Sequence, residues 1–146
     1  MLGYCQCKNL RINWKIKDFS LVPRACQCPN CIEKDAIWLC KSGSTFELSV
    51  RFNEFYKQII GNDHSATQHL CSNCNTLVAI TTFCEEIQHG AVNTNVLIKK
   101  DVFAKPIKVD QYCQLNSNED SNFWHKNWCA PVSIIRPATK LQIIKA

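Results

Sequence analysis

The stretch Cys26-Gln27-Cys28-Pro29-Asn30-Cys31 places three cysteines close together in the chain. Two shorter groups flank it, Cys5-Gln6-Cys7 on the N-terminal side and Cys71-Ser72-Asn73-Cys74 on the C-terminal side. The C-x-C and C-x-x-C spacings set two sulfur atoms on one tight turn, which supplies half of the tetrahedral ligand set that zinc prefers. These seven cysteines therefore predict a small zinc-binding protein.

A disulfide framework is the competing interpretation of a cysteine-rich chain. The sequence contains 11 cysteines, an odd count, and its first ten residues show no basic segment followed by an apolar run, so we expect no secretion signal. Disulfide geometry is also strained between cysteines that are one residue apart. We therefore expect reduced thiols that bind zinc in a cytoplasmic protein, rather than cystines.

The clustered cysteines divide into two sites with different numbers of ligands. Four of them supply a closed set for one structural zinc that joins segments more than 60 residues apart, namely Cys5, Cys7, Cys71 and Cys74. The other three, Cys26, Cys28 and Cys31, leave a position for water or a substrate atom and predict a second, labile and reactive zinc. A fourth ligand would close this second site, and the sequence leaves open the candidates His64, His69, Cys40 and Cys84.

The overall composition suits one globular domain. The chain has 146 residues, of which 46% are apolar and 20% charged, and no apolar run approaches the length that spans a bilayer. The formal charge is +5, and filling both zinc sites would lower it to roughly +2 because thiolates replace thiols. The basic residues are scattered, so we expect neither a membrane nor a nucleic acid as a partner.

Strand signals dominate the sequence. Apolar and polar residues alternate at 10–17 and 45–51, the pattern of half-buried strands. We also expect strands at 36–41, 54–60 and 77–83 and, with a further alternation, at 107–115, while 65–70 leads into the Cys71 group and 123–129 is rich in aromatic residues. No stretch of 12 or more residues has a helical period. We predict a mainly β domain over residues 1–130, with a tail over 131–146 that packs on the domain or adds an edge strand.

The order and spacing of the three cysteine groups are similar to those of the glutathione-dependent formaldehyde-activating enzyme family, which shares its domain with centromere protein V. The likeness covers roughly residues 3–112. Cys5-Gln6-Cys7 before the strand at Arg11 to Ile16 resembles the opening of the family pattern, Ala25 to Cys31 its middle motif, and His69 to Leu77 its closing turn.

The resemblance implies a fold, a division of labour and an activity. The fold is a β-tent of small antiparallel sheets with zinc-binding knuckles. The first and last cysteine groups would hold a structural zinc, and Cys26, Cys28 and Cys31 would hold a reactive one. The activity implied is that of a carbon–sulfur lyase, which forms S-hydroxymethylglutathione from glutathione and formaldehyde. A zinc with an open position can bind a thiol as thiolate, the form that attacks a carbonyl carbon.

The sequence departs from the family pattern at two places. After the middle motif the family usually has one or two basic residues and then a glycine, whereas this chain has Ile32-Glu33-Lys34-Asp35-Ala36. We expect an acidic rim there, which disfavours glutathione because glutathione is itself anionic. At the closing turn Asn75 replaces the usual glycine, and asparagine tolerates the left-handed backbone that such a turn requires.

The remaining candidates have simpler interpretations. We expect Cys40, Cys84, Cys113 and Cys129 to be buried as small apolar residues. The histidines His64, His69, His89 and His125 are expected at the surface or in strands. Trp124, His125 and Trp128 favour packing over ligand stacking, as do Phe52, Phe55 and Tyr56. The segment 116–122, with Glu119 and Asp120, has the composition of a solvated loop.

Two hypotheses of function follow. The first is a zinc-dependent carbon–sulfur lyase that acts on a thiol adduct, with a small thiol or carbonyl compound as substrate and glutathione among the candidates. The second is a non-catalytic module, in which zinc only stabilises the fold and a surface binds protein or nucleic acid. The ligand count favours the enzyme, and the acidic run after Cys31 favours the module or another substrate.

Overall fold

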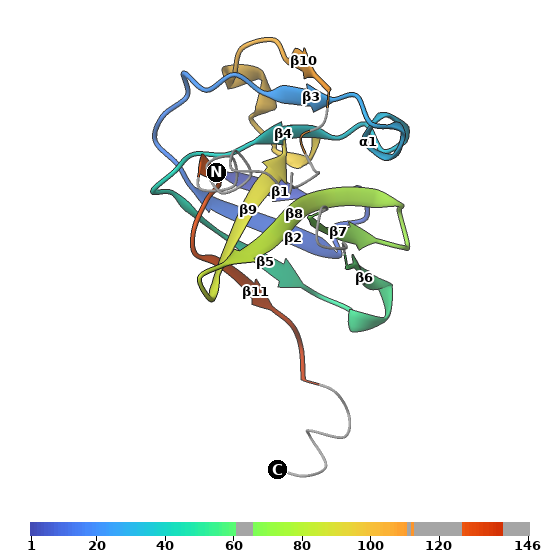
Figure 1. The fold of residues 1–146 in the computed structure, drawn as a ribbon. Helices are drawn as coiled ribbons and strands as arrows, with labels where there is room; N and C mark the ends of the chain where they lie inside the picture. The colour runs from blue at the N-terminus through green and yellow to red at the C-terminus, as the bar shows by residue number, and fades with distance from the viewer. Residues whose placement is uncertain (61–65, 111, 113–126, 139–146) are drawn as a thin grey trace.

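The chain folds into two β-sheets (Figure 1). The computed structural model describes residues 1–60, 66–110, 112 and 127–138. Its strands are β1 (Leu2–Tyr4), β2 (Leu10–Lys15), β3 (Arg24–Cys26), β4 (Ile37–Leu39), β5 (Thr45–Val50), β6 (Tyr56–Ile59), β7 (Thr67–Cys71), β8 (Thr76–Cys84), β9 (Ile87–Asn93), β10 (Ile107–Val109) and β11 (Val132–Ile135). Its helical turns are α1 (Pro29–Glu33) and the 3-10 turns η1 (Asn53–Phe55), η2 (Thr94–Val96) and η3 (Lys100–Val102). The prediction of a mainly β protein is confirmed.

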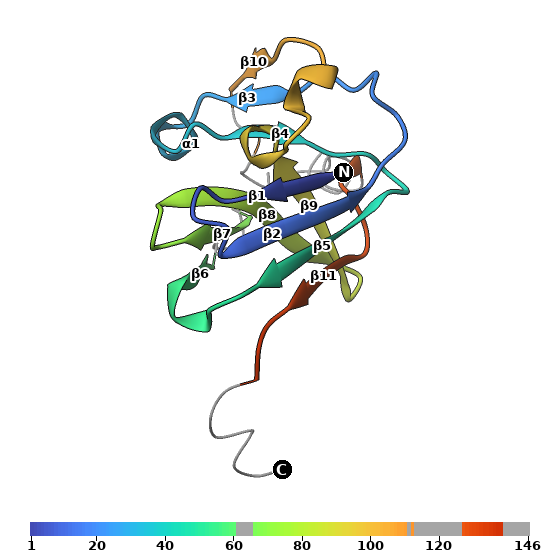
Figure 2. The ribbon, with the colours of Figure 1, turned by 180° about the vertical axis from the view of Figure 1, so that it is seen from behind.

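The smaller sheet has the order β1-β2-β5-β11 and faces the viewer in Figure 2. Every second residue of β2 is buried, as in Leu10, Ile12 and Trp14, and its antiparallel partner β5 shows the same alternation. Buried residues lie opposite one another across the pair, for example Ile12 and Leu48. The alternation read from the sequence therefore places one face of this sheet in the core, as predicted.

The larger sheet has the order β10-β3-β4-β9-β8-β7-β6. Its long central strand β8 is buried from Leu77 to Thr81, and both neighbouring strands pair with it in antiparallel fashion. A strand buried on both faces loses the alternating pattern and appears as a continuous apolar run. Leu77 and Ile80 pack with Trp38 and Trp128, whereas Val78 belongs to the core that contains Trp14.

The sheets are mixed, whereas the family resemblance implied small antiparallel sheets. Strand β11 runs parallel to β5, and β10 runs parallel to β3. Both are edge strands contributed by later parts of the chain, which return to the sheet margins over long connections, as parallel pairing requires. The segment after Pro131 thus completes the smaller sheet as an edge strand.

Other expectations about strands need correction. The strand expected over 54–60 begins with a 3-10 turn, so only Tyr56–Ile59 is extended. The strand expected over 107–115 is described only as Ile107–Val109, and most of 123–129 lies outside the described residues. Strand β9 was not predicted, because Gln88, His89 and Gly90 interrupt its apolar pattern. The short strands β1 and β3 were not predicted either.

Candidate metal centres

Four of the predicted ligands form one cluster, which we call the four-thiol cluster: Cys5, Cys7, Cys71 and Cys74. Their sulfur atoms all lie within 4.8 Å of one another. The Sγ of Cys7 is 3.7 Å from that of Cys5 and 3.5 Å from that of Cys71. A tetrahedral zinc with Zn–S bonds of 2.3 Å separates its sulfur ligands by about 3.8 Å. The cluster therefore has the dimensions of a closed zinc site.

Two β-hairpins position these thiols. The first follows β1, where the amides of Lys8 and Leu10 donate to the carbonyl and the Sγ of Cys5, respectively. The second joins β7 to β8, and Cys71 pairs with Thr76 across it. Each turn ends in a left-handed residue directly after its second cysteine: Lys8 has φ 66° and Asn75 has φ 56°. The left-handed conformation predicted for Asn75 is confirmed. In this turn it lets the sulfur atoms of Cys71 and Cys74 lie on the same side of the hairpin.

Burial differs across the four-thiol cluster. Cys5 and Cys71 are 1% and 0% exposed, whereas Cys7 is on the surface. Burial raises the pKa of the Cys5 thiol to about 12, and a hydrogen bond from the side chain of Asn73 helps to lower the pKa of Cys7 to about 6. Buried thiols without a cation resist ionisation, whereas a bound metal ion requires thiolates. Metal binding at the core side of this cluster therefore has to displace protons from the buried thiols.

The other three predicted ligands form what we call the three-thiol cluster: Cys26, Cys28 and Cys31. Their sulfur atoms also lie within 4.8 Å of one another. Cys26 ends β3, Cys28 caps the N-terminus of α1, and Cys31 lies inside that short helix. The Sγ of Cys28 accepts a hydrogen bond from the amide of Cys31 at 3.4 Å, and Pro29 occupies the first turn, where its missing N–H costs nothing.

A cavity of about 630 Å³ borders the three-thiol cluster. Cys26 and Cys31 line it, and the residues that continue from α1 into β4 form another part of its wall. Asp35 and Asn95 contribute polar groups, and Asn95 donates a hydrogen bond to the backbone carbonyl of Asp35. The acidic rim expected from the sequence is present here in part: Asp35 lines the cavity, whereas Glu33 lines a neighbouring hollow with Lys34.

The candidate fourth ligands stand apart from the three-thiol cluster within the part of the chain that the structure describes. His69 is buried in β7 and has both ring nitrogens engaged, Nδ1 with the Tyr56 hydroxyl at 2.7 Å and Nε2 with the Thr81 hydroxyl at 2.6 Å. Cys40 is hydrogen-bonded to the Tyr112 hydroxyl at 2.9 Å. Cys84 lies at the end of β8, and His64 is outside the described residues.

The lone cysteines are less buried than expected. Cys129 is 0% exposed, as predicted, but Cys40 and Cys84 are half-buried. Cys84 adjoins the β8–β9 turn, where Phe83 and Ile87 are also exposed, because this hairpin end extends beyond the core. Cys113 lies outside the described residues.

The aromatic residues and the histidines agree with the sequence predictions only in part. Trp128 is a core residue and Tyr56 is buried, as expected, whereas Phe52 is 49% exposed and not packed in a strand. His89 lies in β9 and His69 in β7, in agreement with strand positions. Trp124, His125 and the segment 116–122 lie outside the described residues.

The donor chemistry of both clusters fits zinc. All seven side chains are thiols, and thiolate sets in tetrahedral arrangement are the usual ligands of structural zinc in reducing compartments. Each cluster can thus hold one metal ion, and the geometry is consistent with zinc without identifying it. Among the described residues, no helix has the length and apolar character needed to cross a bilayer.

Comparisons with known proteins support the fold alone. No model of a known protein family matches the sequence, and no curated protein matches it. Among solved structures, a Rhodobacter sphaeroides protein from a structural genomics programme is similar, with a TM-score of 0.56 and 18% sequence identity. The similarity covers 75% of this chain and 100% of that one. At this identity the likeness concerns the arrangement of the strands and not the chemistry.

Proposed function

We propose that the protein is a zinc-dependent enzyme of the carbon–sulfur lyase type, which acts on a thiol adduct such as S-hydroxymethylglutathione. The three-thiol cluster would hold the working zinc, and the four-thiol cluster would hold a structural one. The observation that carries this proposal is the 630 Å³ cavity, whose wall includes Cys26 and Cys31. The four-thiol cluster reaches a described cavity through one ligand, Cys74, which lines a hollow of about 430 Å³, whereas the three-thiol cluster does so through two.

The chemistry would require no redox step. Zinc, when bound, would supply a Lewis acid that favours the thiolate form of a substrate thiol. The thiolate sulfur would form a bond to the carbonyl carbon, the carbonyl π pair would move to oxygen, and the proton released by the substrate thiol would be taken up on that oxygen to give the S-hydroxymethyl product. The reverse reaction breaks the same carbon–sulfur bond, so one site serves both directions.

The described residues contribute positioning and charge. The sulfur of Cys26 accepts a hydrogen bond from the amide of Tyr112 at 3.2 Å, and that of Cys28 accepts one from Cys31, so both ligands are held in place. Asp35 adds a carboxylate to the cavity wall. Because like charges repel, this favours a substrate with less negative charge than glutathione next to the metal.

The family resemblance supports the proposal through the same residues. The three cysteine groups that resemble the formaldehyde-activating enzyme family fall into a set of four and a set of three, as that family's pattern implies. We propose membership of this family on that basis. We also propose a cytoplasmic location, which is supported by the expectation that the clustered cysteines bind metal as thiolates rather than form cystines.

The rival function, a non-catalytic zinc-stabilised binding module, has one observation in its favour. Cys26 and Cys31 are only 2% and 1% exposed, and Cys28 caps the helix that contains Cys31. A metal ion held by such ligands would stiffen the turn between β3 and β4 even without chemistry. The two functions differ in whether a small thiol reaches the metal.

The test measures exchange between thiol and formaldehyde. Zinc-loaded protein is mixed with ¹³C-formaldehyde and glutathione, or with a less anionic thiol such as N-acetylcysteine methyl ester, and exchange is followed by NMR against the uncatalysed rate. We expect acceleration by the native protein, loss of it in Cys28→Ser, and retention in Cys84→Ser, which changes a thiol outside both clusters. Native protein with both zinc ions bound that accelerates exchange of neither thiol would contradict the enzyme and favour the binding module.

A further inference from the structure

The four-thiol cluster has one ligand on the surface of the molecule. Cys7 is exposed, whereas Cys5 and Cys71 are buried and Cys74 is half-buried. A metal ion in the cluster would hold all four side chains as thiolates, and the thiolate is the form of cysteine that oxidants attack. Exposure therefore decides which of these sulfur atoms meets an oxidant in solution, and it selects Cys7.

A second thiol lies close enough to form a disulfide with the exposed one. The Sγ of Cys7 is 3.5 Å from that of Cys71 and 3.7 Å from that of Cys5. Cys5 is a poor partner because it is only one residue away from Cys7, where disulfide geometry is strained. Cys74 is also less suited, since its sulfur is hydrogen-bonded with the Thr76 hydroxyl at 3.1 Å. Cys71 is the remaining partner, and its sulfur has to move by about 1.5 Å to reach bonding distance.

Burial of Cys71 is compatible with this role. A sulfenic acid formed on Cys7 arises inside the cluster, so the Cys71 sulfur meets it without contacting solvent. Burial also shields Cys71 from the oxidant itself, so that one thiol is oxidised first and the other responds. An exposed thiolate beside a second, resolving thiol is the usual arrangement of redox-sensing cysteines.

The three-thiol cluster lacks this arrangement. Cys26 and Cys31 are buried, and the half-buried Cys28 accepts a hydrogen bond from the amide of Cys31. Among the cysteines that the structure describes, Cys7 alone is exposed. A dissolved oxidant should therefore react first at the four-thiol cluster, although the three-thiol cluster is the one that borders the larger cavity.

We propose that Cys7 is an oxidation site for peroxides, which convert Cys7 and Cys71 into a disulfide and release the metal ion of the four-thiol cluster. The Cys7 thiolate attacks one peroxide oxygen, the O–O bond breaks, and hydroxide leaves behind a sulfenic acid. The Cys71 thiolate then attacks the Cys7 sulfur, the S–S bond forms, the S–O bond breaks, and a second hydroxide leaves. The two thiolates lose two electrons and the peroxide gains them.

The reaction exchanges one cross-link for another. After oxidation only Cys5 and Cys74 remain as thiolates, and two sulfur atoms supply half of the tetrahedral ligand set that zinc prefers. The disulfide nevertheless joins the same two hairpins as the metal ion and closes the same long loop. The oxidised chain should therefore keep its hairpins together, so that a reductant and zinc restore the original state. The proposal goes beyond the thiol-adduct reaction and uses neither its ligands nor its cavity.

The test uses zinc-loaded native protein and one molar equivalent of hydrogen peroxide. Native mass spectrometry counts the bound zinc ions, peptide mapping locates disulfides, and dimedone traps sulfenic acid at early times. We expect the first dimedone adduct on Cys7, and the loss of one zinc ion for each Cys7–Cys71 disulfide that forms. Dithiothreitol and zinc should then restore the zinc content and the circular dichroism spectrum.

Variants separate the two clusters. Cys7→His keeps a zinc ligand and removes the reactive sulfur, so the variant should lose its zinc to peroxide at least about tenfold more slowly than the native protein. Cys84→Ser and Cys28→Ser are the matched controls, since neither changes the four-thiol cluster. Both should form the Cys7–Cys71 disulfide at the native rate.

Several results would overturn the assignment. A first dimedone adduct on any other cysteine would remove Cys7 as the site of attack, and a first disulfide from Cys7 to Cys5 or Cys74 would remove Cys71 as its partner. Oxidation of Cys26, Cys28 and Cys31 while the four-thiol cluster keeps its zinc would reverse the order of the clusters. These measurements use the native protein, so they decide the question even where Cys7→His does not bind zinc.

Discussion

The four-thiol cluster and the three-thiol cluster use the same ligand atoms but are assembled differently. The first joins two hairpins, so that Cys7 and Cys71 approach from positions 64 residues apart. The second gathers its thiols from one continuous segment at the end of β3 and in α1. A metal ion in the first cluster constrains a long loop of the unfolded chain, whereas one in the second constrains a short loop. Topology, rather than ligand chemistry, therefore separates the site proposed to hold a structural metal ion from the site proposed to hold a reactive one.

A direct contact joins the two regions. Lys34, which follows α1, donates a hydrogen bond to the side chain of Asn75, the residue after Cys74. This exposed contact couples the two regions, and both have strand pairing of their own, so the difference between the clusters comes from the length of the loops that a metal ion would close. Mutations in the two clusters should therefore have unequal effects on the fold.

The largest effect is expected from Cys71→Ser. Structural zinc contributes about 10 kcal/mol or more to folding, which is as large as the whole stability of a typical domain. Cys71 is fully buried, so the variant should be largely unfolded in circular dichroism and NMR spectra. Cys84→Ser, a half-buried thiol outside both clusters, is the control and should remain folded. A native spectrum for Cys71→Ser would remove the structural role of the four-thiol cluster.

The next effect is expected from Cys28→Ser. This variant should keep the native fold and lose one bound zinc, because the three-thiol cluster closes only a short loop. We expect a decrease of about 3 kcal/mol or less in the free energy of unfolding, the linkage of a labile metal ion at up to about 100 times its Kd, because serine itself is a good helix cap. Chemical denaturation and metal analysis of the same sample give both quantities. Unfolding as complete as in Cys71→Ser would make the two clusters equivalent.

A third prediction concerns β1, the strand that precedes Cys5, and it changes no metal ligand. A Cβ atom on Gly3 would lie 2.7 Å from the backbone carbonyl oxygen of Val96, so Gly3→Ala forces β1 away from η2. We expect a loss of about 1–3 kcal/mol in stability, as in other overpacked sites. Gly43→Ala is the comparison, since a Cβ there meets no atom within 4 Å and only its φ of +85° opposes the change. A Gly3→Ala variant as stable as the native protein would show that steric contact at β1 is unimportant, whatever the φ of Gly43 costs in the other variant.

The smallest effect is expected at Asn75. Asn75→Ala and Asn75→Gly both remove the hydrogen bond from Lys34, so the difference between them reports only the left-handed backbone at φ 56°. We expect the alanine variant to be less stable than the glycine variant by about 1 kcal/mol, measured by thermal or chemical denaturation. Equal stability of the two variants would mean that the turn after Cys74 changes its conformation.

The sequence was sufficient to predict the strands in which apolar and polar residues alternate regularly. It was also sufficient to predict how the clustered thiols group. Strands β2 and β5 show alternation because one face is buried and the other is not, and the C-x-C and C-x-x-C spacings determine local turns. Strand β9 was not predicted, because its Gly90 is selected by space: a Cβ there would lie 2.9 Å from both Phe46 and Val132. Such a constraint comes from other strands and leaves no periodic signal in β9 itself.

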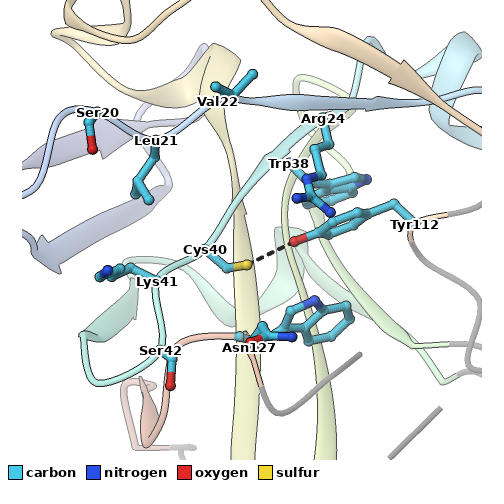
Figure 3. A pocket seen from close by; sticks show the side chains of 11 residues that line it. Ser20, Leu21, Val22, Arg24, Trp38, Cys40, Lys41, Ser42, Tyr112 and Asn127 are labelled. Atoms are coloured by element: carbon cyan, nitrogen blue, oxygen red, sulfur yellow. Dashed lines mark hydrogen bonds between the residues drawn. The ribbon is translucent and has the colours of Figure 1, made fainter. Parts of the chain in front are cut away.

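A cavity of about 440 Å³ beside β3 and β4 (Figure 3) could not be predicted for a related reason. Arg24, Trp38, Lys41 and Tyr112 belong to separate segments, and no local motif connects them. Arg24 and Trp38 become neighbours only through the pairing of β3 with β4, and Tyr112 joins them through its contacts with Cys26 and Cys40. Local spacing can reveal metal ligands, whereas a cavity between segments requires the fold.

Metal content measured on the native protein and on Cys28→Ser, before and after treatment with a chelator, tests the central claim most directly. The claim is that one metal ion is integral to the fold and the other is accessible. We predict two zinc ions per native chain, of which the chelator removes one without loss of the fold, and one chelator-resistant zinc in a folded Cys28→Ser protein. Reduced native protein that contains no metal, or a Cys28→Ser protein that loses both zinc ions and unfolds, would contradict it.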